Sequence, residues 1–227
     1  MAHILNNPIW NALISGNSNL AIGTESIKYF PSTIAPFIGL KEVTEESLKQ
    51  LHEILPAERI GVLITADQPV IPQGWNIITQ DVIYQMTGEN LSYRETQKEI
   101  VPLGEQHVPQ MLALTKLTNP GPFSERTIEF GHYKGIFEDG KLAAMAGRRM
   151  HAGEHVEVSA VCTHPDHLGK GYAGMIVLEV ARGIIEQGYT PYLHVRQDNK
   201  NAISLYEKLG FKIRCDMNVN VLQKAAV

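Results

Sequence analysis

Cysteines, aromatic residues and long hydrophobic runs are all scarce in this sequence. Only Cys162 and Cys215 occur among 227 residues, and aromatic residues make up 7% of the chain. The first residues, MAHILNNPIWNAL, have neither the basic start nor the long apolar run of a secretion signal. We therefore expect a cytoplasmic protein with two free thiols rather than a disulfide framework. No apolar stretch has the length of a bilayer span, so we also expect no membrane partner.

An excess of positive charge is lacking too. The chain has 20 Lys and Arg residues against 24 Asp and Glu residues, for a net charge of −4. Because no long basic run is present either, we expect no nucleic-acid partner. Hydrophobic residues make up 44% of the chain, which is ample for a packed core. The length suits one large domain or two small ones.

The N-terminal part contains no catalytic motif. Its clearest feature is an amphipathic pattern after Thr44, which predicts a helix over 44–55. A polar, turn-like segment at 87–90 marks the expected boundary. We predict a smaller, degenerate α/β unit at 1–92 and a second unit at 93–227 that holds the site.

The second unit is expected to alternate between strands and helices. Apolar residues spaced three and four apart predict a helix that Gly188 ends, and Glu138–Asp139–Gly140 predicts a hairpin turn. The expected strands are 96–103, 133–137, 142–150, 156–161, 192–196 and 211–222, and the expected helices are 105–117, 170–187 and 199–209.

A glycine-rich turn links the strand at 156–161 to the helix at 170–187. Gly169 and Gly171 lack a Cβ where a phosphate would approach the backbone. The start of the helix offers unpaired N–H groups and a positive dipole end, and Lys170 adds charge. The turn therefore indicates a pyrophosphate site, although glycine spacing alone fits a tight turn without a ligand equally well.

The same glycines also spell G-x-G-x-x-G, the fingerprint of dinucleotide-binding domains. They are Gly169, Gly171 and Gly174, and Asp198 follows at about the distance of a ribose-binding acid. Two features disfavour this alternative. A dinucleotide unit usually opens its domain, whereas this one begins late in the chain, and a second helix starts immediately after Asp198.

Three segments carry a resemblance to a known family. They are Val161–Cys162–Thr163–His164–Pro165, Leu168–Gly169–Lys170–Gly171–Tyr172–Ala173, and Asn199-x-x-Ala202-x-x-x-Tyr206-x-x-x-Gly210–Phe211. They resemble the splayed central strand, the Q/R-x-x-G-x-G/A pyrophosphate loop and the late helix of the GNAT superfamily of N-acetyltransferases. More closely, they are similar to its glycine N-acyltransferase-like branch. Leu168 departs from the pattern, because Gln or Arg is usual there.

The resemblance, which covers residues 95–222, implies a fold and a co-substrate. The fold is α/β (α+β), with a mixed, mainly antiparallel sheet that is splayed at its centre and flanked by helices. The co-substrate is acetyl-CoA, and no metal is implied. The residues implied to bind it are Val161, Cys162, Thr163, Leu168, Gly169, Lys170, Gly171, Tyr172, Ala173, Gly174, Asn199 and Tyr206. A bulge near Val161 would open a slot for the thioester, and an N–H there would stabilise the oxyanion.

Two side chains are candidates for proton transfer. Tyr206 is implied as the acid that protonates the leaving thiolate, and its alternative role is a core tyrosine. Glu157 is the candidate base, because strand alternation places it on the face of Ser159 and Val161. The opposite, apolar face would carry Val156, Val158 and Ala160. The alternative for Glu157 is an ion-paired glutamate without a catalytic role.

Other groups have weaker cases. Phe123 and Arg126 would wall the acceptor pocket and hold a carboxylate, or else belong to a surface loop. Arg148 and Arg149 would meet an acidic substrate or the CoA phosphates, or else form a solvated edge. Cys162 is expected to pack rather than to react. His151, His155, His164 and His167 do not share one helical face, so we expect no metal site.

These patterns predict direct transfer of an acetyl group from acetyl-CoA to a primary amine of a small molecule or amino acid. A non-catalytic acyl-CoA-binding protein and an acetyltransferase acting on protein amines are the alternatives. The N-terminal unit would cover the site or provide a homodimer contact.

Overall fold

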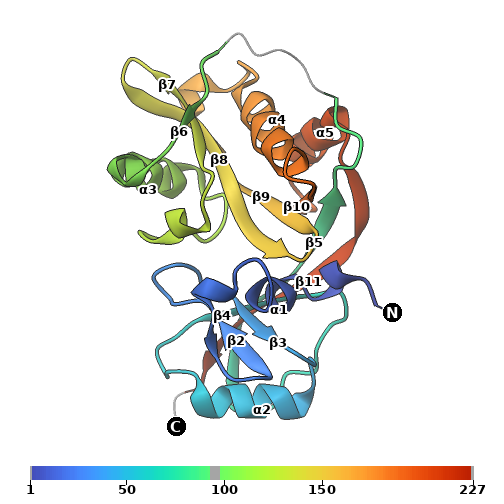
Figure 1. Ribbon diagram of the computed structural model, residues 1–227. Coiled ribbons are helices and arrows are strands. Elements are labelled where there is room, and N and C mark those ends of the chain that lie inside the picture. Colours follow the sequence, from blue (N-terminus) through green and yellow to red (C-terminus); the bar gives the residue numbers. More distant parts are fainter. Residues whose placement is uncertain (1, 93–97, 226–227) are drawn as a thin grey trace.

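The computed structural model describes residues 2–92 and 98–225, and its largest element is an eight-stranded sheet (Figure 1). All neighbouring strands are antiparallel except one parallel pair at the centre. The predicted mixed, mainly antiparallel sheet is therefore confirmed. In spatial order its strands are β4 (Gly61–Thr65), β11 (Lys212–Lys224), β5 (Trp75–Thr87), β10 (Thr190–Arg196), β9 (His155–Thr163), β8 (Lys141–Ala152), β7 (Lys134–Glu138) and β6 (Val101–Pro102).

Helices cover both faces of this sheet, and each face has its own hydrophobic core. The helices on one face are α1 (Pro8–Leu13) and α3 (Val108–Thr118), and those on the other are α4 (Tyr172–Ile185) and α5 (Lys200–Leu209) (Figure 1). Ile9 and Met111 pack with Cys162 of β9 in the first core. Ile176 and Tyr206 belong to the second core. Burial of these apolar faces holds the helices against the sheet.

The N-terminal part adds a small sheet and one helix, in the lower half of Figure 1. They are β1 (Ile22–Gly23), β2 (Ile27–Tyr29), β3 (Ile38–Leu40) and α2 (Glu45–Ile54). Thr44 caps α2 as predicted, through reciprocal hydrogen bonds with Ser47 at 3.1 and 3.0 Å. Leu48 and Leu51 of α2 pack with Trp75 in a third core. Because β4 and β5 precede residue 92 yet belong to the large sheet, the division of the chain at that residue stays a prediction.

Most of the predicted elements are present. The helices expected at 170–187 and 199–209 are α4 and α5, and Gly188 has the positive φ, 82°, of a helix stop. The hairpin is formed by β7 and β8. Of the strand expected at 96–103, the described residues form β6, and the Leu103 N–H adds a hydrogen bond of 2.9 Å to the Tyr133 carbonyl. Its residues 96 and 97 lie outside the described residues.

β9 and β10 pair with each other only at their beginnings. Their parallel pairing ends at Glu157 and Tyr192. Beyond this point β10 continues along β5 to Arg196, and β9 continues along β8 to Thr163. The sheet is therefore splayed at its centre, as predicted, and the inner edges of the two strands carry unpaired backbone groups. No helix in the described part of the chain is long and apolar enough to cross a membrane.

Candidate active site

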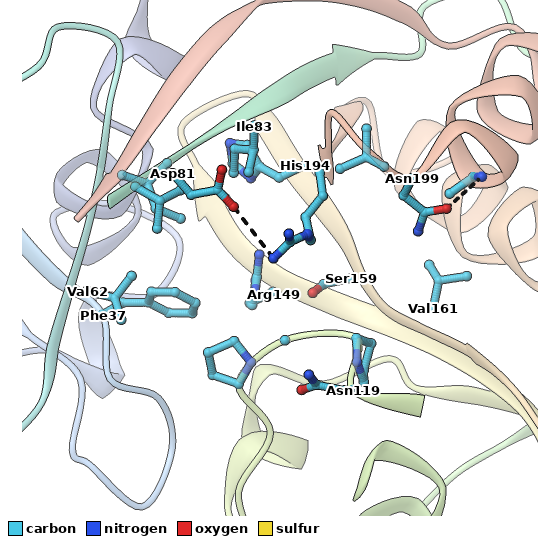
Figure 2. A pocket seen from close by; sticks show the side chains of 18 of the residues that line it. Phe37, Val62, Asp81, Ile83, Asn119, Arg149, Ser159, Val161, His194 and Asn199 are labelled. Atoms are coloured by element: carbon cyan, nitrogen blue, oxygen red, sulfur yellow. Dashed lines mark hydrogen bonds and ion pairs between the residues drawn. The ribbon is translucent and has the colours of Figure 1, made fainter. Parts of the chain in front are cut away.

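A cavity of about 400 Å³ lies where β9 and β10 separate (Figure 2). Phe37 and Val62 lie at one end of it, Val161 and Asn199 at the other, and Arg149 between them. Its apolar lining includes Phe37, Val62, Ile64, Val219 and Val221, and its polar lining consists of Thr79, Asp81, Asn119, Arg149, Ser159, His194, Arg196, Asn199 and Tyr206.

A β-bulge in β9 shapes the wall of the cavity. Two residues of β9, Ala160 and Val161, lie opposite the single residue Ala146 of β8. Ala160 has a φ of 52°, a left-handed conformation that costs a non-glycine residue roughly 1–2 kcal/mol. The bulge predicted near Val161 is therefore confirmed. Backbone strain of this kind is typical of functional sites.

The bulge also overturns the predicted faces of β9. Alternation from Glu157 placed Val161 on the same face and Ala160 on the opposite one. In the structure, Val161 packs with Val158 in the core beneath α4 and α5, whereas Ala160 packs with Cys162 in the core beneath α1 and α3. The extra residue of the bulge reverses the alternation. The prediction that Glu157 and Val161 share a face is therefore wrong.

The glycine-rich turn leads from β9 into α4, as expected. Gly169 and Gly171 have φ angles of 77° and 78°, which glycine adopts without strain. A Cβ at Gly169 would meet no atom within 4 Å, so the space beside the turn is open. Among the described residues, none accepts a hydrogen bond from the backbone N–H groups of residues 169–174. These N–H groups and the positive end of the α4 dipole form a surface suited to a pyrophosphate.

The side chains of the turn are mostly engaged elsewhere. The Nζ of Lys170 lies 2.9 Å from Nδ1 of His167, and the buried Tyr172 donates its hydroxyl proton to Glu138. Leu168 is 65% exposed. Any contact of Lys170, Tyr172, Ala173 or Gly174 with acetyl-CoA would therefore run mainly through the backbone, and it stays a prediction.

α5 brings two predicted residues to the cavity. Asn199 caps the helix, because its Oδ1 accepts a hydrogen bond of 3.1 Å from the Ala202 N–H, and its amide lines the cavity. Tyr206 is 7% exposed, and its hydroxyl makes no hydrogen bond to a described residue. Burial, and to a lesser extent Cys162, raises the pKa of Tyr206 to about 12. The hydroxyl is therefore protonated at neutral pH and free to donate.

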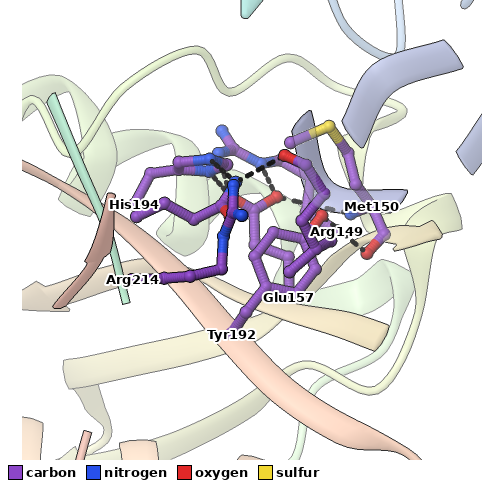
Figure 3. Close-up of polar contacts among 8 residues, drawn as sticks. Arg149, Met150, Glu157, Tyr192, His194 and Arg214 are labelled. Atoms are coloured by element: carbon purple, nitrogen blue, oxygen red, sulfur yellow. Dashed lines mark hydrogen bonds and ion pairs between the residues drawn. The ribbon is translucent and has the colours of Figure 1, made fainter. Parts of the chain in front are cut away.

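Glu157 is fully buried where β9 and β10 separate, and it does not line the cavity (Figure 3). Arg149 donates to its carboxylate from Nε and Nη2 at 2.7 and 2.6 Å, and Nδ1 of His194 lies 2.7 Å from its Oε1. Burial alone would raise the pKa of Glu157, but the charge of Arg149 and these hydrogen bonds outweigh it and lower the pKa to about 2. Glu157 as the base stays a prediction, and this geometry favours a positioning role instead.

A hydrogen-bond chain behind Glu157 fixes the tautomer of His194. Arg214, which can only donate, donates its Nε–H to Oε1 of Gln85 at 2.5 Å, so the Gln85 amide nitrogen faces His194. That nitrogen lies 3.0 Å from Nε2 of His194 and donates also to the Leu5 carbonyl at 3.1 Å. Nε2 must therefore accept, which leaves the ring proton on Nδ1, facing Glu157. The network holds His194 and Arg149 in fixed orientations.

The predicted acceptor residues lie outside the cavity. Phe123 packs edge-to-face on Tyr133 at 5.7 Å, and Arg126 forms a surface ion pair with Glu129. The segment immediately before them, 119–122, lines the cavity instead. The geometry does not support a substrate role for Phe123 or Arg126.

The remaining candidate residues make packing contacts. Cys162 is buried, and burial raises its pKa to about 11, so it packs rather than reacts. Both cysteines are free thiols, as expected. His151 packs on Tyr189 and His155 on His3. Within residues 2–92 and 98–225, no group of three or more His, Cys, Asp or Glu side chains is arranged to hold a metal.

Several residues of the cavity escaped sequence reasoning. His194 meets Glu157 only because β9 and β10 are parallel neighbours, and Asp81 reaches the cavity only through the pairing of β5 with β10 and β11. Phe37 comes from the N-terminal part. One signal was available: Arg149 and Glu157 are charged residues within mostly apolar, buried strands, and such residues are seldom buried unless paired.

Residues 133–220 match the FR47-like protein family. A crystal structure of a GNAT-family protein from Novosphingobium aromaticivorans DSM 12444 is 33% identical, with a TM-score of 0.91 over 99% of this chain and 100% of its own. The chain belongs to the GNAT family.

Two more distant GNAT-type structures share its fold. A GCN5-related N-acetyltransferase from Kribbella flavida is 14% identical, with a TM-score of 0.67 over 100% of this chain and 98% of its own. An N-acetyltransferase-like protein from Streptococcus suis 89/1591 is 14% identical, with a TM-score of 0.52 over 90% of this chain and 82% of its own.

No curated protein gives a significant match to this chain. The finer assignment, to the glycine N-acyltransferase-like branch, stays a prediction.

The residues of this GNAT site fit acetyl-CoA. The hydroxyl of Thr163, at the end of β9, is buried and has no hydrogen-bond partner among the described residues. The splay leaves backbone groups of β9 unpaired, and the open glycine-rich turn follows directly along the chain. This succession suits an elongated ligand with amide groups near the cavity and phosphates near α4.

Proposed function

We propose that this protein transfers the acetyl group of acetyl-CoA to the primary amine of a small molecule, by direct attack in a ternary complex. The cavity at the splay of β9 and β10 is the observation that carries the proposal. One end holds Val161 and Asn199 and leads to the glycine-rich turn, which suits the thioester. Tyr206, on the helix that Asn199 caps, also lines the cavity. The other end is closed by Phe37 and Val62, which leaves room for a small acceptor.

Tyr206 is the proposed acid. Acetyl-CoA supplies a thioester, at which the C–N bond to the amine forms and the C–S bond breaks. Tyr206 donates its proton to the departing thiolate and regains a proton from solvent. The N–H of Val161, at the bulge, is the proposed donor to the oxygen that becomes negative, an interaction worth a few kcal/mol in acyl transfer generally.

Asp81 is the proposed acceptor of the amine proton. Its carboxylate lines the cavity, and 39% of its side chain is exposed. A water molecule can therefore carry the proton from the amine to Asp81. Its ion pair with Arg196 is long, at 3.5 Å. Glu157 has a different proposed role, which is to hold Arg149 and His194 in place from behind the cavity wall.

A thiol-release assay tests the proposal. Acetyl-CoA is offered with amino acids, polyamines and amino sugars in turn, and the products are identified by mass spectrometry. We expect thiol release that depends on one acceptor class, with an equal amount of N-acetylated product. Calorimetric binding of acetyl-CoA with no release on any acceptor would refute catalysis and indicate a binding protein.

A further inference from the structure

Arg149 presents an unused hydrogen-bonding edge to the cavity. Only 11% of its side chain is exposed, and it lines the cavity between the two ends (Figure 2). Glu157 occupies the edge formed by Nε and Nη2. Among the described residues, none accepts a hydrogen bond from Nη1. One proton of Nη1 and one of Nη2 therefore form a free fork, which matches a carboxylate.

The guanidinium is held rigidly in this position. Its carbon lies 4.8 Å from the centre of the Phe37 ring, a cation–π contact on one side. Glu157 fixes it in the plane, His194 holds Glu157 in turn, and Gln85 holds His194. A fork that is fixed in advance loses little entropy when it binds a ligand. N–H groups that lack hydrogen-bond partners in a largely buried cavity also cost free energy, which favours a ligand that accepts hydrogen bonds from both.

From this geometry we propose that Arg149 binds the α-carboxylate of the acceptor, and that the acceptor is an amino acid with an apolar side chain. The inference rests on the proposed acetyl transfer and deepens it. The fork lies next to Ser159, near the end assigned to the thioester, and an α-carboxylate lies two bonds from the reacting nitrogen. The side chain of the acceptor would then extend toward Phe37, Val62 and Val219.

The cavity disfavours the other acceptor classes. A polyamine would place a second ammonium near Arg149, which repels it. An amino sugar would bury several hydroxyl groups against Val62, Ile64 and Val221, where Thr79 and Asp81 are the polar neighbours and cannot pair with all of them. An apolar amino acid satisfies both the fork and the apolar end.

Leucine and leucinamide provide the sharpest comparison with the wild-type enzyme. They have nearly the same shape, and leucinamide has the less basic amine, so more of it is unprotonated near pH 8. Without carboxylate recognition, leucinamide would be the better acceptor. We expect kcat/KM for leucine to exceed that for leucinamide by roughly 100-fold, because leucinamide leaves the charged fork poorly paired. Leucine should also exceed asparagine, whose amide would be buried in the apolar end, by about 10-fold or more.

Variants assign the effect to Arg149. Arg149→Lys keeps a charge beside Glu157 but lacks the fork, and we expect it to raise KM for leucine while changing KM for leucinamide little. Arg148→Lys is the matched control, since Arg148 is the next residue of β8 but binds Gln187 outside the cavity. Melting temperatures check that both variants fold. If Arg149→Lys fails to fold, the comparison of leucine with leucinamide in the wild-type enzyme still tests whether the acceptor carboxylate is recognised.

The outcomes separate this inference from the proposed function. If leucinamide is as good an acceptor as leucine, or if Arg149→Lys impairs both acceptors equally, the carboxylate assignment is wrong while acetyl transfer stands. If acetyl-CoA binds but no amine is acetylated, the proposed function fails, and this inference fails with it.

Discussion

Tyr206 combines three properties at the scale of single residues. It lines the cavity, its hydroxyl makes no hydrogen bond to a described residue, and its pKa of about 12 keeps it protonated. A proton donor placed in this way typically contributes a factor of 10² to 10⁴ to the rate. We therefore expect Tyr206→Phe to lower kcat by about 10²-fold or more without weakening the binding of acetyl-CoA.

Tyr84→Phe is the matched control for this variant. Tyr84 packs against the same core from β5, and its hydroxyl makes no hydrogen bond to a described residue, but it does not line the cavity. Steady-state kinetics should show that Tyr84→Phe leaves kcat unchanged, and calorimetry should show that it leaves the binding of acetyl-CoA unchanged. Equal kcat values for the Tyr206→Phe variant and wild type would remove Tyr206 from the chemistry.

Glu157 makes the stability of the protein depend on pH. Its pKa is about 2 in the folded state against an ordinary value of 4.5. The stabilisation is therefore fully present above pH 4.5 and is lost as the pH falls through 2. By linkage the loss amounts to about 3 kcal/mol. Glu138, whose pKa the Lys98 and Tyr172 hydrogen bonds also lower to about 2, contributes to the pH dependence of both proteins. Urea titrations between these two pH values should therefore show a loss that is larger in wild type than in Glu157→Gln by this amount.

Glu157→Gln should also lower the free energy of unfolding at neutral pH by about 3–5 kcal/mol, because it leaves Arg149 buried without a counter-charge. Glu129→Gln breaks another Arg–Glu pair, at the surface with Arg126, and should cost less than about 1 kcal/mol. Similar costs for the two variants would contradict the buried role of Glu157.

At the scale of elements, the glycine-rich turn and the end of α4 offer an internal comparison. Gly169 and Gly188 have φ angles of 77° and 82°, and a Cβ at either would meet no atom within 4 Å. Ala at either position should therefore cost similar stability, about 1–2 kcal/mol. Only Gly169→Ala places a methyl group where a pyrophosphate would lie. We expect Gly169→Ala alone to raise the KM for acetyl-CoA, and equal KM changes in both variants would place the phosphates elsewhere.

The same elements show what local patterns predict. The glycine-rich turn, Asn199 and Tyr206 lie within one continuous stretch, so local patterns correctly predicted the turn before α4 and the helix that carries Asn199 and Tyr206. Glu157 was misplaced relative to Val161, because a single extra residue in β9 reverses alternation and no residue type marks it. His194 and Asp81 depend on which strands are neighbours. Local sequence does not specify that order.

At the scale of the whole molecule, the three hydrophobic cores are joined by shared strands. β5 carries Trp75 of the third core and also pairs with β10 at the cavity. The N-terminal part, which supplies Phe37 and Val62, therefore cannot unfold without disturbing the large sheet. We predict one cooperative unfolding transition for the described fold.

Fluorescence tests this prediction directly. Both tryptophans, Trp10 and Trp75, lie in the first 92 residues, so their emission reports that part, whereas far-UV circular dichroism reports the entire chain. The two urea transitions should coincide. A fluorescence transition at lower urea would show an N-terminal unit that unfolds independently, in agreement with a division near residue 92.

In the proposed function, thioester and amine lie side by side in the cavity before any bond changes, and no residue carries the acetyl group between them. Initial rates with acetyl-CoA and acceptor both varied measure this most directly. We predict double-reciprocal lines that intersect, as a ternary complex requires. Parallel lines, together with an acetylated enzyme seen by mass spectrometry in the absence of acceptor, would contradict direct transfer at the splay of β9 and β10.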